Sequence, residues 1–310
     1  MSILKLKPAC KDYIWGGDRL IREYHKEFDG AQLAETWELS CHKDGLSVIS
    51  EGEYAGMTLS DYIGLRGRGI LGSNCAIFQD FPILIKFIDA DKDLSIQVHP
   101  NNLYALDHEK QYGKSEMWYV LDAEPGAHIY YGFKRHISKE EYEQRIKDNS
   151  LTEVLNIRPI KKGDCIFIPP GTVHAICRGA VIAEIQQNSN VTYRVYDYGR
   201  KDALGNERQL HVEKAVDVSH LDFPQNNYDF GGHLLRCMYF TVDLFDSERL
   251  IVADDESFIS ILVIDGEGTI SNGSQVESCR KGDSLFIPAS SGICCISRNL
   301  KVLCTRIGTI

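Results

Sequence analysis

Five side chains with metal-binding or acid–base chemistry lie in three short segments of the sequence. The segment LSIQVHPNN places Gln97 and His99 two positions apart, and GKSEMWYV places Lys114 and Glu116 at the same spacing. Residues two apart on a β-strand face the same way, so each pair points to one side of its strand. The third segment, KKGDCIFIPPGTVHAI, presents His174 after a Pro-Gly turn. If the three segments meet, two imidazoles, a carboxylate and an amide would make a site for a divalent metal with open positions for substrate.

A second copy of the third segment shows whether the fold itself requires the histidine. KGDCIFIPPGTVHAI at 162–176 is echoed by KGDSLFIPASSGICCI at 281–296. In both copies Lys-Gly-Asp predicts a tight turn, and the proline ends the strand because it cannot donate to the ladder. The second copy has Cys294 in place of His174, and no histidine lies in the strand pair upstream of it. We therefore interpret the turns of the first copy as elements that position a ligand.

The elements around these segments are mostly short strands. Apolar or aromatic runs such as FPILIKFID, EMWYVLDAE and VIAEIQQ alternate with Gly, Pro, Asn and Asp, which favours strands. Helical signals are few. Ser138 and Glu141 form a capping box that opens a helical insertion over about 138–155, and 57–64 and 207–218 are shorter candidates. The pattern predicts a mainly β chain of jelly-roll type with a few short helices inserted.

The histidine segments resemble the two signature motifs of the cupin superfamily. Gly163, Pro169, Gly171 and His174 have the spacing of the second motif, although Arg178 stands where an asparagine usually follows. QVH and KSE stand where the first motif supplies its ligands. The resemblance implies a barrel whose interior holds the metal.

The repeat predicts two cupin domains. We expect a metal-binding catalytic cupin at 1–225, which includes an N-terminal extension, and a second cupin without metal ligands at 233–310. The segment DFPQNNYDFGGH at 222–233 is loop-like and marks the predicted boundary.

Composition narrows the class of protein. Of the 310 residues, 43% are hydrophobic and 25% are charged, as in a globular protein with a sizeable core. The net charge of −10 argues against a nucleic-acid partner, and a phosphorylated substrate would need local basic residues. The sequence has neither a signal peptide nor an apolar stretch of membrane-spanning length. Its ten cysteines are scattered without a CxxC pair, so we expect free thiols, no membrane partner and a cytoplasmic location.

A longer set of motifs resembles the mannose-6-phosphate isomerase (type I phosphomannose isomerase) family in its short bacterial form. The motifs include KPACKDYIWGG, ETWELSCHKDG, QVHPNN, GKSE and TYRVYDYGR, and the resemblance covers at least residues 7–215. It implies an enzyme that interconverts mannose 6-phosphate and fructose 6-phosphate through a metal-stabilised enediol or enediolate. It also implies one zinc ion per chain.

The resemblance assigns roles to individual residues. It implies that His99, Glu116 and His174 are the zinc ligands, and Gln97 is the fourth ligand in longer relatives. Arg194, in TYRVYDYGR, stands where the family has its catalytic arginine.

The chemistry of such an isomerase suggests further roles. A permanently charged guanidinium such as that of Arg194 can stabilise the oxyanion without competing for the proton. Lys114 is our candidate for the general acid–base, because burial beside a metal favours a neutral amine, and Lys86 in LIKFID is the alternative. Arg200 and Lys201 could bind the phosphate, as could either lysine.

Two other classes of protein remain open at this point. Two histidines and a carboxylate also form the iron site of cupin oxygenases. A sugar-binding cupin without catalytic activity is the second alternative. The sequence predicts no oligomeric state.

Overall fold

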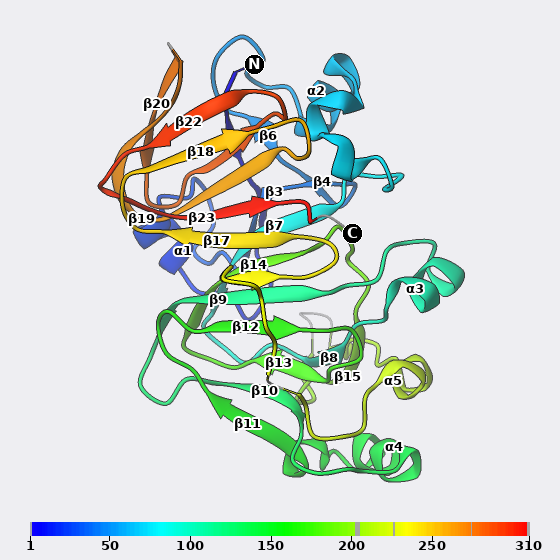
Figure 1. Cartoon of the computed structure of the whole chain (residues 1–310). Helices are drawn as coiled ribbons and strands as arrows, with labels where there is room; N and C mark the ends of the chain where they lie inside the picture. Colours follow the sequence, from blue (N-terminus) through cyan, green and yellow to red (C-terminus); the bar gives the residue numbers. More distant parts are fainter. Residues whose placement is uncertain (1, 202–204, 226, 274, 309–310) are drawn as a thin grey trace. The chain divides into compact units, whose positions relative to one another are not determined.

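The computed structural model describes residues 2–201, 205–225, 227–273 and 275–308. By internal contacts the chain divides into two compact units. The terminal unit consists of Met1–Ile14, Asp18–Ile88 and Asp229–Ile310, and the central unit consists of Trp15–Gly17 and Asp89–Tyr228. Strands predominate in both, which confirms the predicted mainly β class (Figure 1).

This grouping differs from the predicted domains at 1–225 and 233–310. The division at Tyr228 falls inside the predicted boundary loop, but most of the first 88 residues belong with the C-terminal residues. The reason is strand pairing, because β1 (Leu4–Lys7) pairs antiparallel with β21 (Ser284–Ile287). In addition, the amide side chain of Gln275 hydrogen-bonds the backbone N–H and carbonyl of Ile3.

The central unit contains two sets of antiparallel strands. One is a five-stranded sheet in the order β11-β10-β13-β8-β15, and the other has the order β12-β9-β14. The strands are β8 (Ile96–Val98), β9 (Glu116–Ala123), β10 (His128–Phe133), β11 (Leu155–Pro159), β12 (Cys165–Ile168), β13 (His174–Ile176), β14 (Ala180–Gln187) and β15 (Tyr193–Tyr196). The helices are α3 (Asn102–His108), α4 (Lys139–Lys147), α5 (Val212–Val218) and the 3₁₀ turn η3 (Leu151–Glu153).

The terminal unit is a larger antiparallel assembly. One path of its strands has the order β16-β17-β23-β19-β21-β1-β6, β18 and β22 join it through β19, and β7, β3 and β2 form a further row. The N-terminal strands are β2 (Ala9–Lys11), β3 (Glu35–Leu39), β4 (Cys41–His42), β5 (Gly45–Leu46), β6 (Val48–Ile49) and β7 (Ile83–Ala90). The C-terminal strands are β16 (Leu235–Arg236), β17 (Thr241–Phe245), β18 (Arg249–Ala253), β19 (Ile259–Asn272), β20 (Gln275–Arg280), β22 (Gly292–Ile296) and β23 (Leu300–Arg306). The helical segments are α1 (Arg19–Tyr24), α2 (Leu59–Arg66), η1 (Arg68–Leu71) and η2 (Ser73–Cys75).

The repeated Lys-Gly-Asp turn has the same geometry in both units. Gly163 and Gly282 have φ angles of 92° and 97°, which favour glycine. The carboxylates of Asp164 and Asp283 each accept a hydrogen bond from the backbone N–H three residues earlier. The strands that follow these turns occupy equivalent places, in the orders β12-β9-β14 and β21-β19-β23. This agreement supports the interpretation that one β-fold occurs twice.

The predicted helical insertion forms, but it is shorter than expected. The Ser138 hydroxyl caps the helix by accepting from the Glu141 N–H at 3.1 Å, whereas the Glu141 carboxylate pairs with Arg135 and Arg145. Tyr142 and Ile146 lie on the buried face of α4. The α-helix ends at Lys147, a 3₁₀ turn follows, and β11 begins at Leu155. The other two helical predictions correspond to α2 and α5, whereas α1 and α3 were not predicted.

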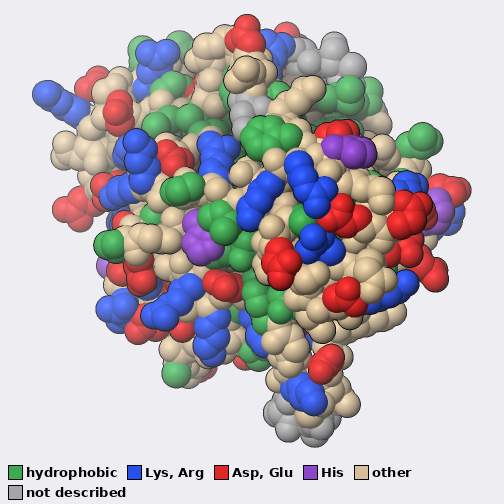
Figure 2. All heavy atoms as spheres, turned by 90° about the horizontal axis from the view of Figure 1, so that it is seen from below, with side chains coloured by type: hydrophobic (Ala, Val, Ile, Leu, Met, Phe, Trp, Pro, Cys, Tyr) green, Lys and Arg blue, Asp and Glu red, His purple; other side chains and the backbone are tan. Residues whose placement is uncertain are grey.

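The surface does not concentrate one sign of charge on the face drawn in Figure 2. Basic and acidic side chains are interspersed there. On this face, a phosphorylated substrate would depend on individual basic residues to overcome the net charge of −10.

Candidate active site

Three predicted metal ligands meet inside the central unit. His99 follows β8, Glu116 begins β9 and His174 begins β13. All three side chains are almost completely buried. The Nε2 atoms of His99 and His174 lie 3.3 Å and 3.4 Å from the two carboxylate oxygens of Glu116. One ligand atom from each residue falls within 4.8 Å of the others, and no other such group of three is found in the described part of the chain.

Backbone carbonyls orient both imidazoles toward the centre. The Nδ1 of His99 lies 2.9 Å from the Val191 carbonyl, and the Nδ1 of His174 lies 2.8 Å from the Thr172 carbonyl. A carbonyl oxygen only accepts hydrogen bonds, so each Nδ1 carries the proton and each Nε2 carries a lone pair. The Pro-Gly turn contributes here, because the backbone N–H of Gly171 donates to the His99 carbonyl at 2.8 Å. The turn therefore ties the two histidine segments together.

The site fits a cation. Glu116 Oε2 and His174 Nε2 are buried and have no hydrogen-bond partner among the described residues. Burial lowers the pKa of His174 to about 4, and the charge of Lys114 lowers it further. The hydrogen bond to the Thr172 carbonyl acts in the opposite direction but is the weaker effect. His174 is therefore neutral near pH 7, and its lone pair faces a carboxylate oxygen at 3.4 Å. Two acceptors that face each other in a buried site require a positive charge between them.

Lys114 lies at the centre of this cluster. Its Nζ is 3.2 Å from His99 Nε2 and forms an ion pair with Glu116 Oε1. The lysine is almost completely buried. Its ammonium group thus contacts atoms of two predicted ligands, His99 and Glu116.

A row of side chains leads from the ligands to the predicted catalytic arginine. In register, His174 on β13 lies opposite Gln97 on β8, and Gln97 lies opposite Arg194 on β15. Directly opposed residues share one face of a sheet, so the three belong to one face. Neighbouring strands are about 4.8 Å apart, which places the Arg194 backbone roughly 10 Å from that of His174. An arginine side chain can bridge most of this distance.

Protein contacts hold the Arg194 side chain. Its Nε donates to Ser95 Oγ at 3.2 Å, and one Nη donates to the Gln209 carbonyl at 3.1 Å. Burial lowers the pKa of Arg194, and the charges of Arg208 and Arg200 act in the same direction while Asp197 opposes them. The intrinsic basicity of a guanidinium is so high that it stays charged.

The predicted phosphate-binding residues have different environments. Arg200 forms an ion pair with Asp197 and donates to the Asp93 carbonyl at 2.6 Å. Lys201 is exposed, in an isolated bridge with Glu207.

Lys86, the alternative acid–base residue, belongs to the terminal unit. There its Nζ lies 3.4 Å from a carboxylate oxygen of Glu35 and over the Trp37 ring.

Sequence reasoning missed two acidic residues near the site. Asp197 binds both Arg200 and Arg208 and so holds the two guanidinium groups close together after β15. Glu184 is buried and accepts a hydrogen bond from the Trp118 indole at 2.8 Å, and this indole packs edge-on against the His174 ring. The position of Glu184 in the middle of the apolar run VIAEIQQ could have indicated a buried functional carboxylate.

The terminal unit replaces the ligands by apolar side chains. Glu116 pairs with Ile168 across β9 and β12, and Ile259 pairs with Ile287 across β19 and β21. Ile168 and Ile287 are the same position of the repeated motif, so Ile259 stands where Glu116 would. Ile259 and Cys294 both belong to the apolar core of that unit.

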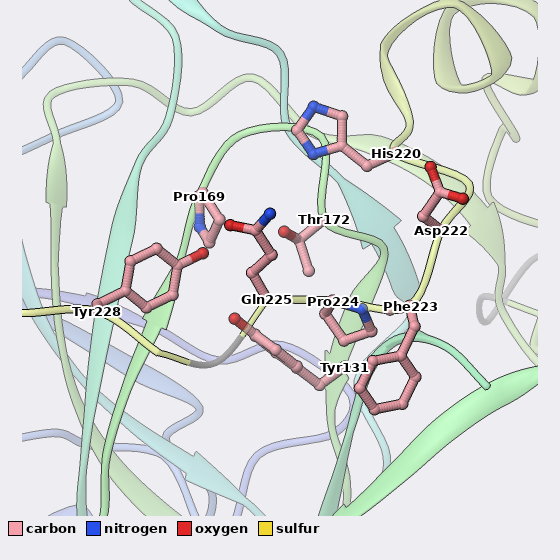
Figure 3. Close-up of a pocket in the computed structure, with 10 residues that line it drawn as sticks. Tyr131, Pro169, Thr172, His220, Asp222, Phe223, Pro224, Gln225 and Tyr228 are labelled. Carbon is pink, nitrogen blue, oxygen red and sulfur yellow. The ribbon is translucent and has the colours of Figure 1, made fainter. Parts of the chain in front are cut away.

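A separate pocket in the central unit contains none of the predicted site residues. It has a volume of about 340 Å³ and opens beside the Pro-Gly turn (Figure 3). Tyr131, Thr172, Phe223, Gln225 and Tyr228 are among the residues that line it. No lysine or arginine is among the described residues around it, so it is a poor place for a phosphate.

Two family models match separate parts of the chain. Residues 3–126 match the family model described as phosphomannose isomerase type I, catalytic domain. Residues 232–306 match the mannose-6-phosphate isomerase cupin domain.

None of the described helices is both long and apolar enough to span a bilayer.

The curated relatives are similar over nearly the whole chain. A mannose-6-phosphate isomerase from Streptococcus mutans is 38% identical over 294 residues, with 92% of each chain covered. One from Bacillus subtilis is 37% identical over 302 residues, covering 93% of this chain and 94% of the relative.

Solved structures agree with the fold. The crystal structure of a Bacillus subtilis mannose 6-phosphate isomerase has a TM-score of 0.88 at 34% identity and covers 98% of this chain and 99% of that one. The apo form of the Salmonella typhimurium enzyme, at 18% identity, shares the fold with a TM-score of 0.79 over 100% of both chains. These similarities confirm the resemblance read from the sequence motifs. The chain belongs to the mannose-6-phosphate isomerase (type I phosphomannose isomerase) family.

Proposed function

We propose that this chain is a zinc-dependent mannose-6-phosphate isomerase whose active site is built on His99, Glu116 and His174. The observation that carries the proposal is the buried pair of acceptors, Glu116 Oε2 and His174 Nε2, beside Lys114. We propose Gln97 as a fourth ligand, because it lies opposite His174 on the neighbouring strand. We propose one zinc ion per chain, because the equivalent positions of the terminal unit are apolar.

The reaction needs a proton to move between C1 and C2 of the open-chain sugar, and it needs charge stabilisation while the enediolate exists. Bound zinc would polarise the carbonyl and hold the substrate oxygens. Lys114, within contact distance of two ligands, is our candidate to move the proton. Arg194 is our candidate to stabilise the oxyanion, because its charge does not depend on the proton being moved.

The remaining cations are candidates for the phosphate. Arg200 is already oriented by Asp197, and Lys201 is exposed beside it. We propose that these two bind the phosphate group of the substrate. Lys86 is the second candidate in either role, although its ammonium group pairs with Glu35 in the terminal unit.

A coupled assay tests the proposal. Purified protein should convert mannose 6-phosphate to fructose 6-phosphate, and a chelator should remove the activity until zinc is added. The donor set alone would also suit an iron oxygenase, so oxygen uptake with a sugar substrate is the discriminating measurement. The chain's similarity to isomerases does not favour that alternative. A protein that binds mannose 6-phosphate without turning it over would be the non-catalytic sugar-binding cupin.

We also propose a cytoplasmic location. Burial raises the pKa of the Cys75, Cys177 and Cys304 thiols to about 12. Such thiols stay protonated and pack as small apolar groups. This supports a protein that works with reduced cysteines.

A further inference from the structure

One residue outside the predicted site fixes the backbone of Arg194. His211 lies directly before α5. Its backbone N–H donates to the Arg194 carbonyl at 2.8 Å. Its ring Nδ1 accepts from the Arg194 backbone N–H at 3.2 Å. A single residue therefore satisfies both polar backbone groups of Arg194.

The same segment also holds the Arg194 side chain. Two residues before His211, the Gln209 carbonyl accepts from the guanidinium at 3.1 Å. One residue further back, Arg208 binds Asp197 through two hydrogen bonds of 2.7 and 2.5 Å. The segment Arg208–His211 is thus anchored at Arg208, directly before its contacts with Arg194. It holds the arginine by main chain and side chain together.

This arrangement requires a neutral His211 ring. Only a neutral imidazole has the Nδ1 lone pair that can accept the Arg194 N–H. Burial lowers the pKa of His211, and the charges of Arg194 and Lys214 add to the lowering while Glu109 opposes it. The environment therefore favours the accepting form.

The strand itself gives Arg194 incomplete support. The pairing of β15 with β8 changes register between Arg194 and Tyr196, so the regular ladder is interrupted directly after the arginine. A backbone at an irregular strand position can shift unless other groups hold it. A displacement of about 1 Å at a charge-stabilising group can cost roughly 10²-fold in rate.

We propose that His211 is a positioning residue for Arg194, which fixes where the guanidinium meets the reacting oxygens. This inference rests on the catalytic role proposed above for Arg194. His211 would act through Arg194 alone.

Two amide variants test the hydrogen bond itself. In His211→Asn the side-chain oxygen can occupy the place of Nδ1 and accept the Arg194 N–H. In His211→Gln the amide reaches the place of Nε2 instead. We expect His211→Ala and His211→Gln to lower kcat about 10- to 100-fold with little change in KM. His211→Asn should recover most of the loss. Zinc content should stay the same in all three, because His211 touches no proposed ligand.

A double-mutant cycle separates this inference from the role of Arg194. If His211 acts through Arg194, the variant Arg194→Ala/His211→Ala should be no slower than Arg194→Ala alone. If the rate losses of the two single variants multiply in the double variant, the inference is overturned and the role of Arg194 stays intact. Equal activity of the His211→Asn and His211→Gln variants would have the same consequence. If Arg194→Ala keeps its kcat, both ideas fail. His136→Ala is the matched control, because this exposed histidine pairs with Asp222. An equal loss of kcat in the control would also overturn the inference.

Discussion

Replacing Arg194 by alanine is the sharpest test of how the site works. The structure shows two hydrogen bonds from its guanidinium, to Ser95 Oγ and the Gln209 carbonyl. A guanidinium has five N–H donors, so donors remain for a substrate oxygen. If those donors stabilise charge that exists only at the enediolate, their loss should lower kcat by about 10²–10³ and change KM far less.

Two companion measurements show whether the loss is catalytic. The two hydrogen bonds to protein are each worth about 1 kcal/mol, so the variant should unfold a few degrees lower yet remain folded. Zinc content should be unchanged, since a permanent cation does not bind the metal. Arg194→Lys should recover little, because an ammonium cannot reproduce the two-pronged contact. Steady-state kinetics with mannose 6-phosphate measure kcat and KM separately and so show whether Arg194 acts in catalysis or in binding. An unchanged kcat with a raised KM would make Arg194 a phosphate clamp and refute the reasoning.

Three further predictions concern the ligands, the thiols and the acid stability. His174→Ala should lose both zinc and activity but keep a cooperative unfolding transition, because the terminal unit has an apolar core at the equivalent positions; loss of that transition would make the metal structural. Titration of denatured, unreduced protein should recover nearly all ten thiols, and extensive disulfide protection would contradict the cytoplasmic assignment. Burial acts to raise the pKa of Asp197, but its bonds to Arg208 and Arg200 outweigh this and hold the pKa below the ordinary value of 3.8. The ionised carboxylate therefore adds stability that is complete above about pH 4 and is lost as the pH falls through the lower folded-state pKa. Asp197→Asn should flatten that part of the curve of Tm against pH, and an unchanged curve would contradict it.

The directions of the predicted ligand side chains could be inferred from the sequence because strand geometry is local. Spacing of two residues decides which way strand side chains face, and this placed Gln97 with His99. The Pro-Gly turn before His174 likewise depends only on nearby residues. The repeat then supplied a comparison within the chain, since Cys294 showed that the fold does not need a histidine. That the three segments meet at one site was instead implied by their resemblance to the cupin motifs.

Longer-range features were not predictable in the same way. The pairing of Leu4 with Phe286 joins the two ends of the chain, and no local pattern indicates it. Backbone carbonyls of Val191 and Thr172 orient the two imidazoles. Because every residue has a backbone carbonyl, the sequence does not indicate which two would take this role. The contact of His211 with Arg194 likewise depends on how the segment after β15 returns to the strand.

Zinc titration of the metal-free protein tests whether His99, Glu116 and His174 form the catalytic centre. Purified protein is stripped with a chelator, zinc is added back stepwise, and mannose 6-phosphate isomerisation is measured beside metal content. We expect activity to be lost on stripping and to return in full at one zinc per chain. Stripped His174→Ala should neither bind the ion nor regain activity. Full activity of the stripped protein, or restoration that needs two ions per chain, would contradict the claim that His99, Glu116 and His174 form the catalytic centre.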